Sequence, residues 1–176
     1  HIINSFTEKG CKNFFMTVNY KQKILKAFFE DLNPDYSISH IIENKPLGTA
    51  GSIKLIKNKF KVPFFVSNCD IIIKTDYSKI YEFHKKNNYD ITLIASAKEY
   101  EIPYGTCELN SEGSLHCINE KPKYDFLINT GLYILNPDIK DIIPRDKFYH
   151  ITDLIEDSKK QGKKIGVYPI NEDAWI

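Results

Sequence analysis

Apolar and polar positions along this chain alternate between two periods, and the alternation predicts strands and helices that follow one another. Short apolar runs are typical of buried strands, and apolar residues spaced three and four apart are typical of one face of a helix. The expected strands are 14–18, 39–42, 62–67 and 91–97, and the expected helices are 20–29, 51–58 and 78–86. Strands that alternate with helices usually form parallel pairs joined by right-handed crossovers. We therefore expect an α/β fold with a Rossmann-like, mostly parallel sheet flanked by helices.

The pattern changes after Tyr100, where the apolar runs become shorter. Strands are expected at 106–109, 115–119, 126–135 and 165–170, with a helix at 152–160. Both ends look cut, because 1–6 resembles the second half of an amphipathic helix and the sequence stops on Trp175 and Ile176. We expect one domain over 1–176, incomplete at each terminus.

Composition and charge exclude several classes of function. The chain has 176 residues, with 24 Lys and Arg against 23 Asp and Glu, so its net charge is +1. The basic residues are scattered, which argues against nucleic acid or an anionic membrane as a partner. The longest apolar runs are strand-sized, and the four cysteines lack zinc-like spacing. We expect a cytoplasmic protein and leave a homo-oligomer open.

The segment Pro46–Gly51 contains the first candidate chemistry. Gly48 and Gly51 lack a Cβ where a base or phosphate could approach the backbone, and a helix that begins near Ala50 would direct its positive end there. An ordinary loop leading into a helix is the alternative. Upstream, Glu43 could accept hydrogen bonds from the donor groups of guanine, or be a solvated charge.

Asp70 follows the apolar run 62–67 and so should lie at the carboxyl end of a central parallel strand. Open α/β sheets bind ligands at this edge. Asp is a hard oxygen ligand, and Mg²⁺ is normally held by one or two carboxylates together with substrate phosphates. The sequence therefore predicts that Asp70 binds Mg²⁺.

Three further segments carry polar residues beside turns. Pro122 holds Glu120 and Lys121 at a rigid corner, where the acid could accept sugar hydroxyls and the ammonium could meet a phosphate. A surface ion pair is the alternative for this segment. Asn129-Thr130-Gly131 interrupts an apolar run and favours hydroxyl recognition, and Tyr104-Gly105 forms another tight turn.

The order of these segments along the chain resembles that of the motifs of the sugar-1-phosphate nucleotidyltransferases. The residues at 43–51 and 129–131 resemble those of mannose-1-phosphate guanylyltransferase-like members. The resemblance covers essentially all 176 residues. It implies a nucleotidyltransferase architecture, Mg²⁺ on Asp70 and the phosphate of the sugar on Lys121. It also implies a nucleotide site with Glu43, Leu47, Gly48, Thr49 and Gly51, and a sugar site with Tyr104, Gly105, Glu120, Asn129, Thr130 and Gly131.

The chain departs from this family at both ends. The family opens with a strand and a Gly-Thr-Arg loop that holds the triphosphate, and it places a second metal-binding aspartate just after a segment like Ala174-Trp175-Ile176. Neither is present, and Asp173 precedes the tryptophan. We expect transfer of a nucleoside monophosphate, preferably GMP, from a nucleoside triphosphate to a sugar-1-phosphate, with this chain inactive by itself.

Two other functions are left open. One is a catalytically silent homologue that regulates or assembles with others, which an intact Asp70 and Lys121 argue against. The other is a metal-dependent glycosyltransferase on a related fold. That class usually has an Asp-x-Asp pair, whereas Asp70 is followed by Ile71 and Ile72.

Overall fold

A computed structural model describes residues 1–57 and 60–176, and every strand expected from the sequence is found there, as are the helices expected at 20–29, 78–86 and 152–160. The α-helices are α1 (Ile2–Thr7), α2 (Gln22–Asp31), α3 (Gly48–Gly51), α4 (Tyr77–Lys86), α5 (Ile139–Ile142) and α6 (Ile151–Lys160). The strands are β1 (Asn13–Val18), β2 (Ser37–Ile42), β3 (Phe64–Ser67), β4 (Ile91–Glu101), β5 (Thr106–Leu109), β6 (Leu115–Asn119), β7 (Lys123–Leu135) and β8 (Ile165–Ile170). Short 3₁₀ turns occur at Ser52–Leu55 (η1) and Glu172–Ala174 (η2). The helix predicted over 51–58 is thus split between α3 and η1, and its last residue lies outside the described residues.

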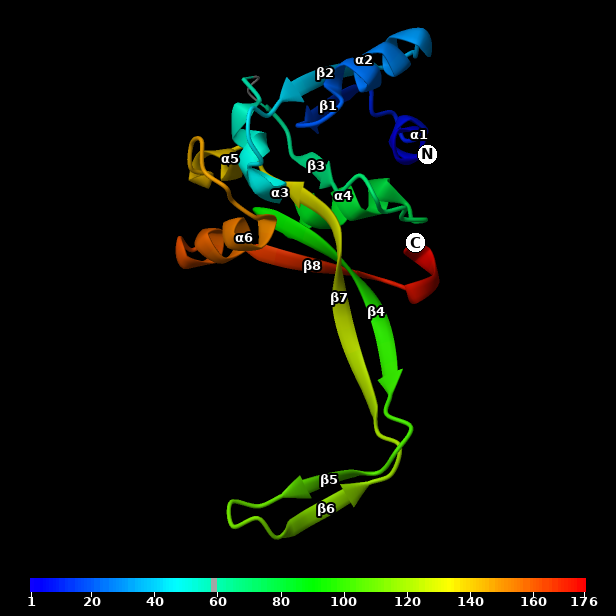
Figure 1. The fold of residues 1–176 in the computed structure, drawn as a ribbon, viewed down its shortest axis with the longest axis vertical. Helices are drawn as coiled ribbons and strands as arrows, with labels where there is room; N and C mark the ends of the chain where they lie inside the picture. The colour runs from blue at the N-terminus through cyan, green and yellow to red at the C-terminus, as the bar shows by residue number, and fades with distance from the viewer. Residues whose placement is uncertain (58–59) are drawn as a thin grey trace.

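The main sheet has four strands in the order β3-β7-β4-β8, and β1 and β2 form a separate parallel pair. β3, β4 and β8 run in the same direction, whereas β7 lies between β3 and β4 and is antiparallel to both. The α/β class and the helices on both faces are confirmed (Figure 1). The prediction that the strand before Asp70 is central was wrong, because β3 lies at the edge of this sheet and its described strand partner is β7.

Each face of the main sheet is covered by its own apolar core. Successive side chains of a strand point to opposite faces, so Leu132 and Ile134 contribute to one core while Tyr133 and Leu135 contribute to the other. The core that we call the α4 core also contains Phe6, Ile71, Ile73, Tyr77, Ile80, Ile94 and Ile170. The α6 core contains Ala50, Ile53, Ile56, Ile91, Ile139, Ile143, Tyr149, Ile151 and Leu154.

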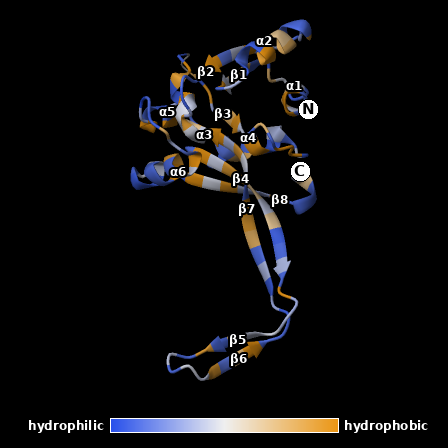
Figure 2. Ribbon diagram, in the orientation of Figure 1, coloured by the Kyte–Doolittle hydropathy of each residue, from blue (hydrophilic) through white to orange (hydrophobic). Residues whose placement is uncertain are grey.

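Beyond the cores, β4 and β7 continue as a two-stranded ribbon, which we call the arm. Its paired part runs from Ala97 opposite Leu127 to Glu101 opposite Lys123, and the β5–β6 hairpin lies at its far end (Figure 1). Figure 2 shows hydrophobic and hydrophilic residues mixed along the arm, where no helix covers them. Phe126 and Leu127 are 53% and 58% exposed. Both strands are longer than the sequence predicted.

A bulge separates the arm from the body, by which we mean the four-stranded sheet with its two cores and the helices that cover them. Leu93 pairs with Tyr133 and Ala95 pairs with Asn129, so three residues of β7, 130–132, lie opposite Ile94 alone. Gly131 has a φ of +86°, which suits glycine. The hydroxyl of buried Thr130 donates to the Ile94 carbonyl at 2.8 Å. Such bulges redirect a strand and are common beside functional sites.

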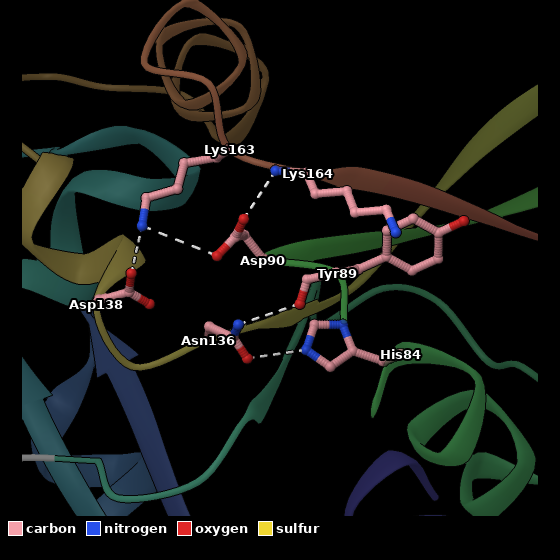
Figure 3. Close-up of polar contacts among 7 residues, drawn as sticks. All are labelled: His84, Tyr89, Asp90, Asn136, Asp138, Lys163 and Lys164. Carbon is pink, nitrogen blue, oxygen red and sulfur yellow. Dashed lines mark hydrogen bonds and ion pairs between the residues drawn. The ribbon is translucent and has the colours of Figure 1, made fainter. Parts of the chain in front are cut away.

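At the end of the sheet away from the arm, a polar cluster joins α4, the start of β4 and the end of β7 (Figure 3). The buried ring of His84 contacts Thr92 Oγ1 through Nδ1 at 2.8 Å and Asn136 Oδ1 through Nε2 at 3.0 Å. Burial lowers the pKa of His84, although its bond to Asn136 and the nearby Asp90 act in the other direction. The ring is therefore neutral, donating from Nε2 and accepting at Nδ1.

Candidate functional site

The glycine segment packs against the protein's own backbone. A Cβ at Gly48 would lie 2.7 Å from the Tyr149 carbonyl oxygen, and one at Gly51 would lie 2.8 Å from the Lys147 carbonyl oxygen. The Tyr149 carbonyl also accepts from the N–H groups of Ala50 and Gly51, at 3.0 and 3.1 Å. The sequence predicted that a base or phosphate approaches the backbone at these glycines. In the structure, the segment just before α6 lies against both of them.

Two side chains predicted to bind the nucleotide also hold this segment together. Glu43 Oε2 accepts from the Leu47 N–H at 3.1 Å, which closes the loop before α3. Thr49 Oγ1 accepts from the Ile151 N–H at 2.8 Å, at the first residue of α6. These contacts give the segment a structural role, and its role in nucleotide binding stays a prediction.

Asp70 lies in the turn that follows β3 and is exposed. Its carboxylate makes no hydrogen bond or ion pair with any other residue that the structure describes. Ile71, the next residue, is 9% exposed and packs in the α4 core, so the chain enters the interior directly after Asp70. The carboxylate is therefore free to bind a ligand from solvent.

The turn at 129–131 meets the loop of Asp70. The N–H of Asn68 donates to the Gly131 carbonyl at 3.0 Å, one step beyond the pairing of Ser67 with Leu132. Asn129 uses its side chain within the turn, accepting from the Gly131 N–H at 3.1 Å and donating to the Tyr133 hydroxyl at 2.7 Å. The sugar-binding roles of Asn129, Thr130 and Gly131 stay predictions.

The remaining predicted sugar residues gather at the far end of the arm. A Cβ at Gly105 would lie 2.9 Å from Glu120 Oε2, so the turn of Tyr104 and Gly105 meets the corner that carries Glu120 and Lys121. All four residues are exposed, and Lys121 has a φ of +45°. The structure thus brings these two segments together, and their sugar-binding roles stay predictions.

The structure does not bring Asp70 and Lys121 together. Six residue steps separate Lys123 from Asn129 along β7, and at roughly 3.3 Å each they span ~20 Å, with Lys121 beyond them. The expectation that both groups face one ligand therefore does not hold in this conformation. The cause is the unbroken ladder from Ala97 to Glu101, which carries the corner away from the body.

A Mg²⁺ ion fits the donor set around Asp70. No group of three or more His, Cys, Asp and Glu side chains in 1–57 and 60–176 is placed to hold a metal. Mg²⁺ needs fewer protein ligands than that, because it retains water and binds substrate phosphates. A single exposed carboxylate without an internal partner is a suitable anchor for such an ion.

Two residues that organise the site, Tyr149 and Asn68, were not predicted from the sequence. Tyr149 forms the backbone contacts of the glycine segment, and its hydroxyl donates to Asp157 Oδ2 at 2.7 Å. Burial, and then this bond to Asp157, raise the pKa of Tyr149 well above its usual value. Asn68 lies two residues before Asp70, and its contact with Gly131 is visible only in the folded chain. Within the described residues, no helix is long and apolar enough to cross a membrane.

Comparison with known proteins gives a match over the whole chain. The model of a family described as Nucleotidyl transferase matches residues 1–176. A curated relative, the mannose-1-phosphate guanyltransferase of Yarrowia lipolytica, is 35% identical over 153 residues, which cover 81% of this chain and 42% of that protein. The chain therefore spans less than half the length of this relative.

Solved structures share the fold. HddC from Yersinia pseudotuberculosis aligns with a TM-score of 0.69 and 24% identity, covering 99% of this chain and 76% of that one. The same protein complexed with GMP-PN aligns with a TM-score of 0.65 and 22% identity, covering 96% of this chain and 74% of that one. These likenesses confirm the nucleotidyltransferase architecture expected from the sequence.

Proposed function

The chain belongs to the nucleotidyl transferase family, and from this premise we propose that the complete protein transfers a nucleoside monophosphate from a nucleoside triphosphate to a sugar-1-phosphate. The products are a nucleotide sugar and pyrophosphate. The observation that carries the proposal is the placement of Asp70. Asp70 lies in the turn after β3, two residues beyond the contact of Asn68 with Gly131 in the β7 bulge, and its carboxylate has no partner among the described residues of a chain that matches the family along its whole length.

Each group has a defined task in this reaction. Mg²⁺, held by Asp70, supplies positive charge that offsets the charge developing on the phosphates. Lys121 neutralises the sugar phosphate, and Glu120 accepts hydrogen bonds from sugar hydroxyls. The sugar phosphate is already an anionic nucleophile, so no general base is required. Catalysis then depends mainly on alignment and charge.

The arm has to approach the body for Lys121 and Asp70 to act on one sugar phosphate. Lys121 lies at the far end of the arm, and the strands that carry it are exposed on both faces. A two-stranded ribbon without a covering layer is marginally stable by itself. We propose that the arm bends toward the bulge when substrates bind.

GTP is the preferred nucleotide in this proposal. The support comes from the curated relative, which is named a mannose-1-phosphate guanyltransferase, and from the carboxylate of Glu43 near the glycine segment. Glu43 now accepts from the Leu47 N–H, so it would have to exchange that bond for donor groups of the base. Mannose-1-phosphate is accordingly the first sugar phosphate to test.

We also propose that 1–176 is part of a larger nucleotidyltransferase domain and that this chain alone turns over poorly. One packing feature supports the idea. Phe14 and Phe15 of β1 pack on the α4 core and the α6 core, respectively, yet β1 is hydrogen-bonded to β2 and not to the free edge of β3.

The test is pyrophosphate release by the complete protein. GTP, CTP, UTP and ATP are each paired with mannose-1-phosphate and glucose-1-phosphate in the presence of Mg²⁺. We expect release with GTP, and we expect Asp70→Asn to lower kcat by at least about a hundredfold without a change in Tm, as for loss of a residue that binds the charged reactants. Asp31→Asn, which changes an exposed carboxylate of α2, is the matched control.

The other outcomes identify the alternatives. No release with any nucleotide would contradict the proposal and favour a silent homologue. Sugar transfer from a nucleotide sugar to an acceptor, without pyrophosphate, would favour a glycosyltransferase. Robust turnover by the 176-residue chain alone would refute only the statement that it needs further residues.

A further inference from the structure

The loop that presents Asp70 is attached to the β7 bulge through Asn68. The backbone N–H of Asn68 donates to the Gly131 carbonyl. Its side chain lies directly over the Gly131 α-carbon, because a Cβ built there would be 2.6 Å from Asn68 Nδ2 and 3.0 Å from its Cγ. The two loops are therefore in direct contact at one exposed side chain.

The bulge that receives Asn68 is held firmly by its own contacts. Thr130 donates to the Ile94 carbonyl from a buried position, and Asn129 accepts from the Gly131 N–H. Gly131 also adopts the left-handed region that glycine tolerates best. The bulge is thus a fixed surface against which the Asp70 loop can be placed.

The loop has a second anchor on its other side. Ile71 is buried in the α4 core, and the backbone of Ile72 exchanges hydrogen bonds with Ile176 at 2.8 and 2.9 Å. Between the two anchors lie only Cys69 and Asp70, which form a turn. No other described side chain bonds to the Asp70 carboxylate, so the anchors alone determine where it stands.

We propose that Asn68 is a positioning residue, which sets the distance between the Asp70 carboxylate and the bulge at 129–131. This inference rests on the proposed function, in which these two loops hold the metal ion and the sugar. Asn68 acts in this proposal through its contact with Gly131. Loss of its side chain leaves the fold intact but allows the Asp70 turn to move relative to the bulge.

The test compares Asn68→Ala with the parent in the complete protein. We expect the Mg²⁺ concentration for half-maximal pyrophosphate release to rise about tenfold, the effect typical of residues that orient metal ligands. Because the side chain is exposed, Tm should change by less than about 2 °C. Asn4→Ala, which changes an exposed asparagine of α1, should alter neither quantity.

A double variant tests the contact itself. Gly131→Ala should lower Tm, and Asn68→Ala should relieve part of that loss, because the new methyl group would then meet Asn68 Cβ at 3.4 Å instead of Nδ2. Additive effects on Tm, an unchanged Mg²⁺ requirement or unfolding of Asn68→Ala would each overturn the proposal. An inactive parent protein would instead refute the function on which the proposal rests.

Discussion

β4 and β7 run through both the body and the arm. Comparison of these two regions shows that a hydrophobic side chain on the same strand can be buried in one region and exposed in the other. Ile134 is fully buried, whereas Leu127 on the same strand is 58% exposed. The two side chains are similar in size and polarity. The difference arises because helices cover both faces of the body and neither face of the arm (Figure 2). A strand's sequence therefore determines which side chains share a face, and the neighbouring layers determine whether that face is buried.

The largest expected effect comes from truncating matched residues of β7. Ile134→Ala should lower the free energy of unfolding by about 2–5 kcal/mol, because it leaves a cavity in the α4 core. Leu127→Ala should lower it by less than about 0.5 kcal/mol, as is usual for exposed positions. Urea unfolding of both variants measures the difference. Equal losses would show that the arm is packed in solution.

A smaller loss of stability is expected when the hydrogen bond of the buried Thr130 is removed. Thr130→Val removes the donor to the Ile94 carbonyl and should cost about 1–3 kcal/mol, because that oxygen is left unpaired in the interior. Thr106→Val, at a half-buried position of β5, removes a longer bond of 3.4 Å to the Asn119 carbonyl and provides the control. Chemical denaturation of the pair would contradict this interpretation if both variants lost the same stability.

The pH dependence of stability should reveal the buried His84. Its pKa is lowered in the folded state, whereas the unfolded imidazole keeps its usual value near ~6.5. The unfolded chain therefore binds more protons in the window between these values, and stability should fall as the pH drops below about 6.5, by at most about 1.4 kcal/mol per pH unit. Thermal unfolding from pH 8 to 5 measures the slope.

Two histidine variants sharpen that measurement. His84→Asn should remove most of the slope below pH 6.5, at some cost in stability at every pH, because the bonds to Thr92 and Asn136 are disturbed. His116→Asn changes an exposed histidine of β6 in the arm and should keep the slope of the parent. A parent protein whose stability is flat over this range would exclude a neutral, buried His84.

The smallest effect is expected from charges on the arm. Lys123 Nζ lies 2.9 Å from Glu99 Oε1 and 3.7 Å from Glu101 Oε2, and all three side chains are exposed. Lys123→Ala should change Tm only slightly, and high salt should abolish the difference because it screens such pairs. A large decrease in Tm that does not depend on salt would contradict this prediction, because it would indicate that Lys123 is buried in solution.

Local pattern was sufficient to predict the elements but not the extent of the arm. The apolar run at 126–135 identified β7, yet Tyr124 and Lys123 read as loop residues until their partners Tyr100 and Glu101 are known. Strand length here depends on pairing between distant segments. For the same reason β3 was predicted to be central, since nothing in its sequence reveals that antiparallel β7 lies between it and β4.

For the candidate site, too, the sequence indicated some features and only the fold shows the others. The sequence indicated the turns at 48–51, 104–105 and 129–131, because glycine among apolar residues implies a close approach. It could not identify what approaches, which is Tyr149 for Gly48, Glu120 for Gly105 and Asn68 for Gly131. Those partners come from other parts of the chain, and only the fold brings them into contact.

The arm also leaves backbone groups available along its length. β8 pairs with β4 only as far as Ser96, and β3 pairs with β7 only from Leu132 onward, so both outer edges of the arm lack a neighbouring strand in the described residues. Tyr100, Tyr124 and Phe126 form an aromatic stripe on one of its faces. Such a ribbon is a template for strand addition. Purified at high concentration, the chain is therefore prone to gather into β-rich assemblies, and a covering partner would protect it.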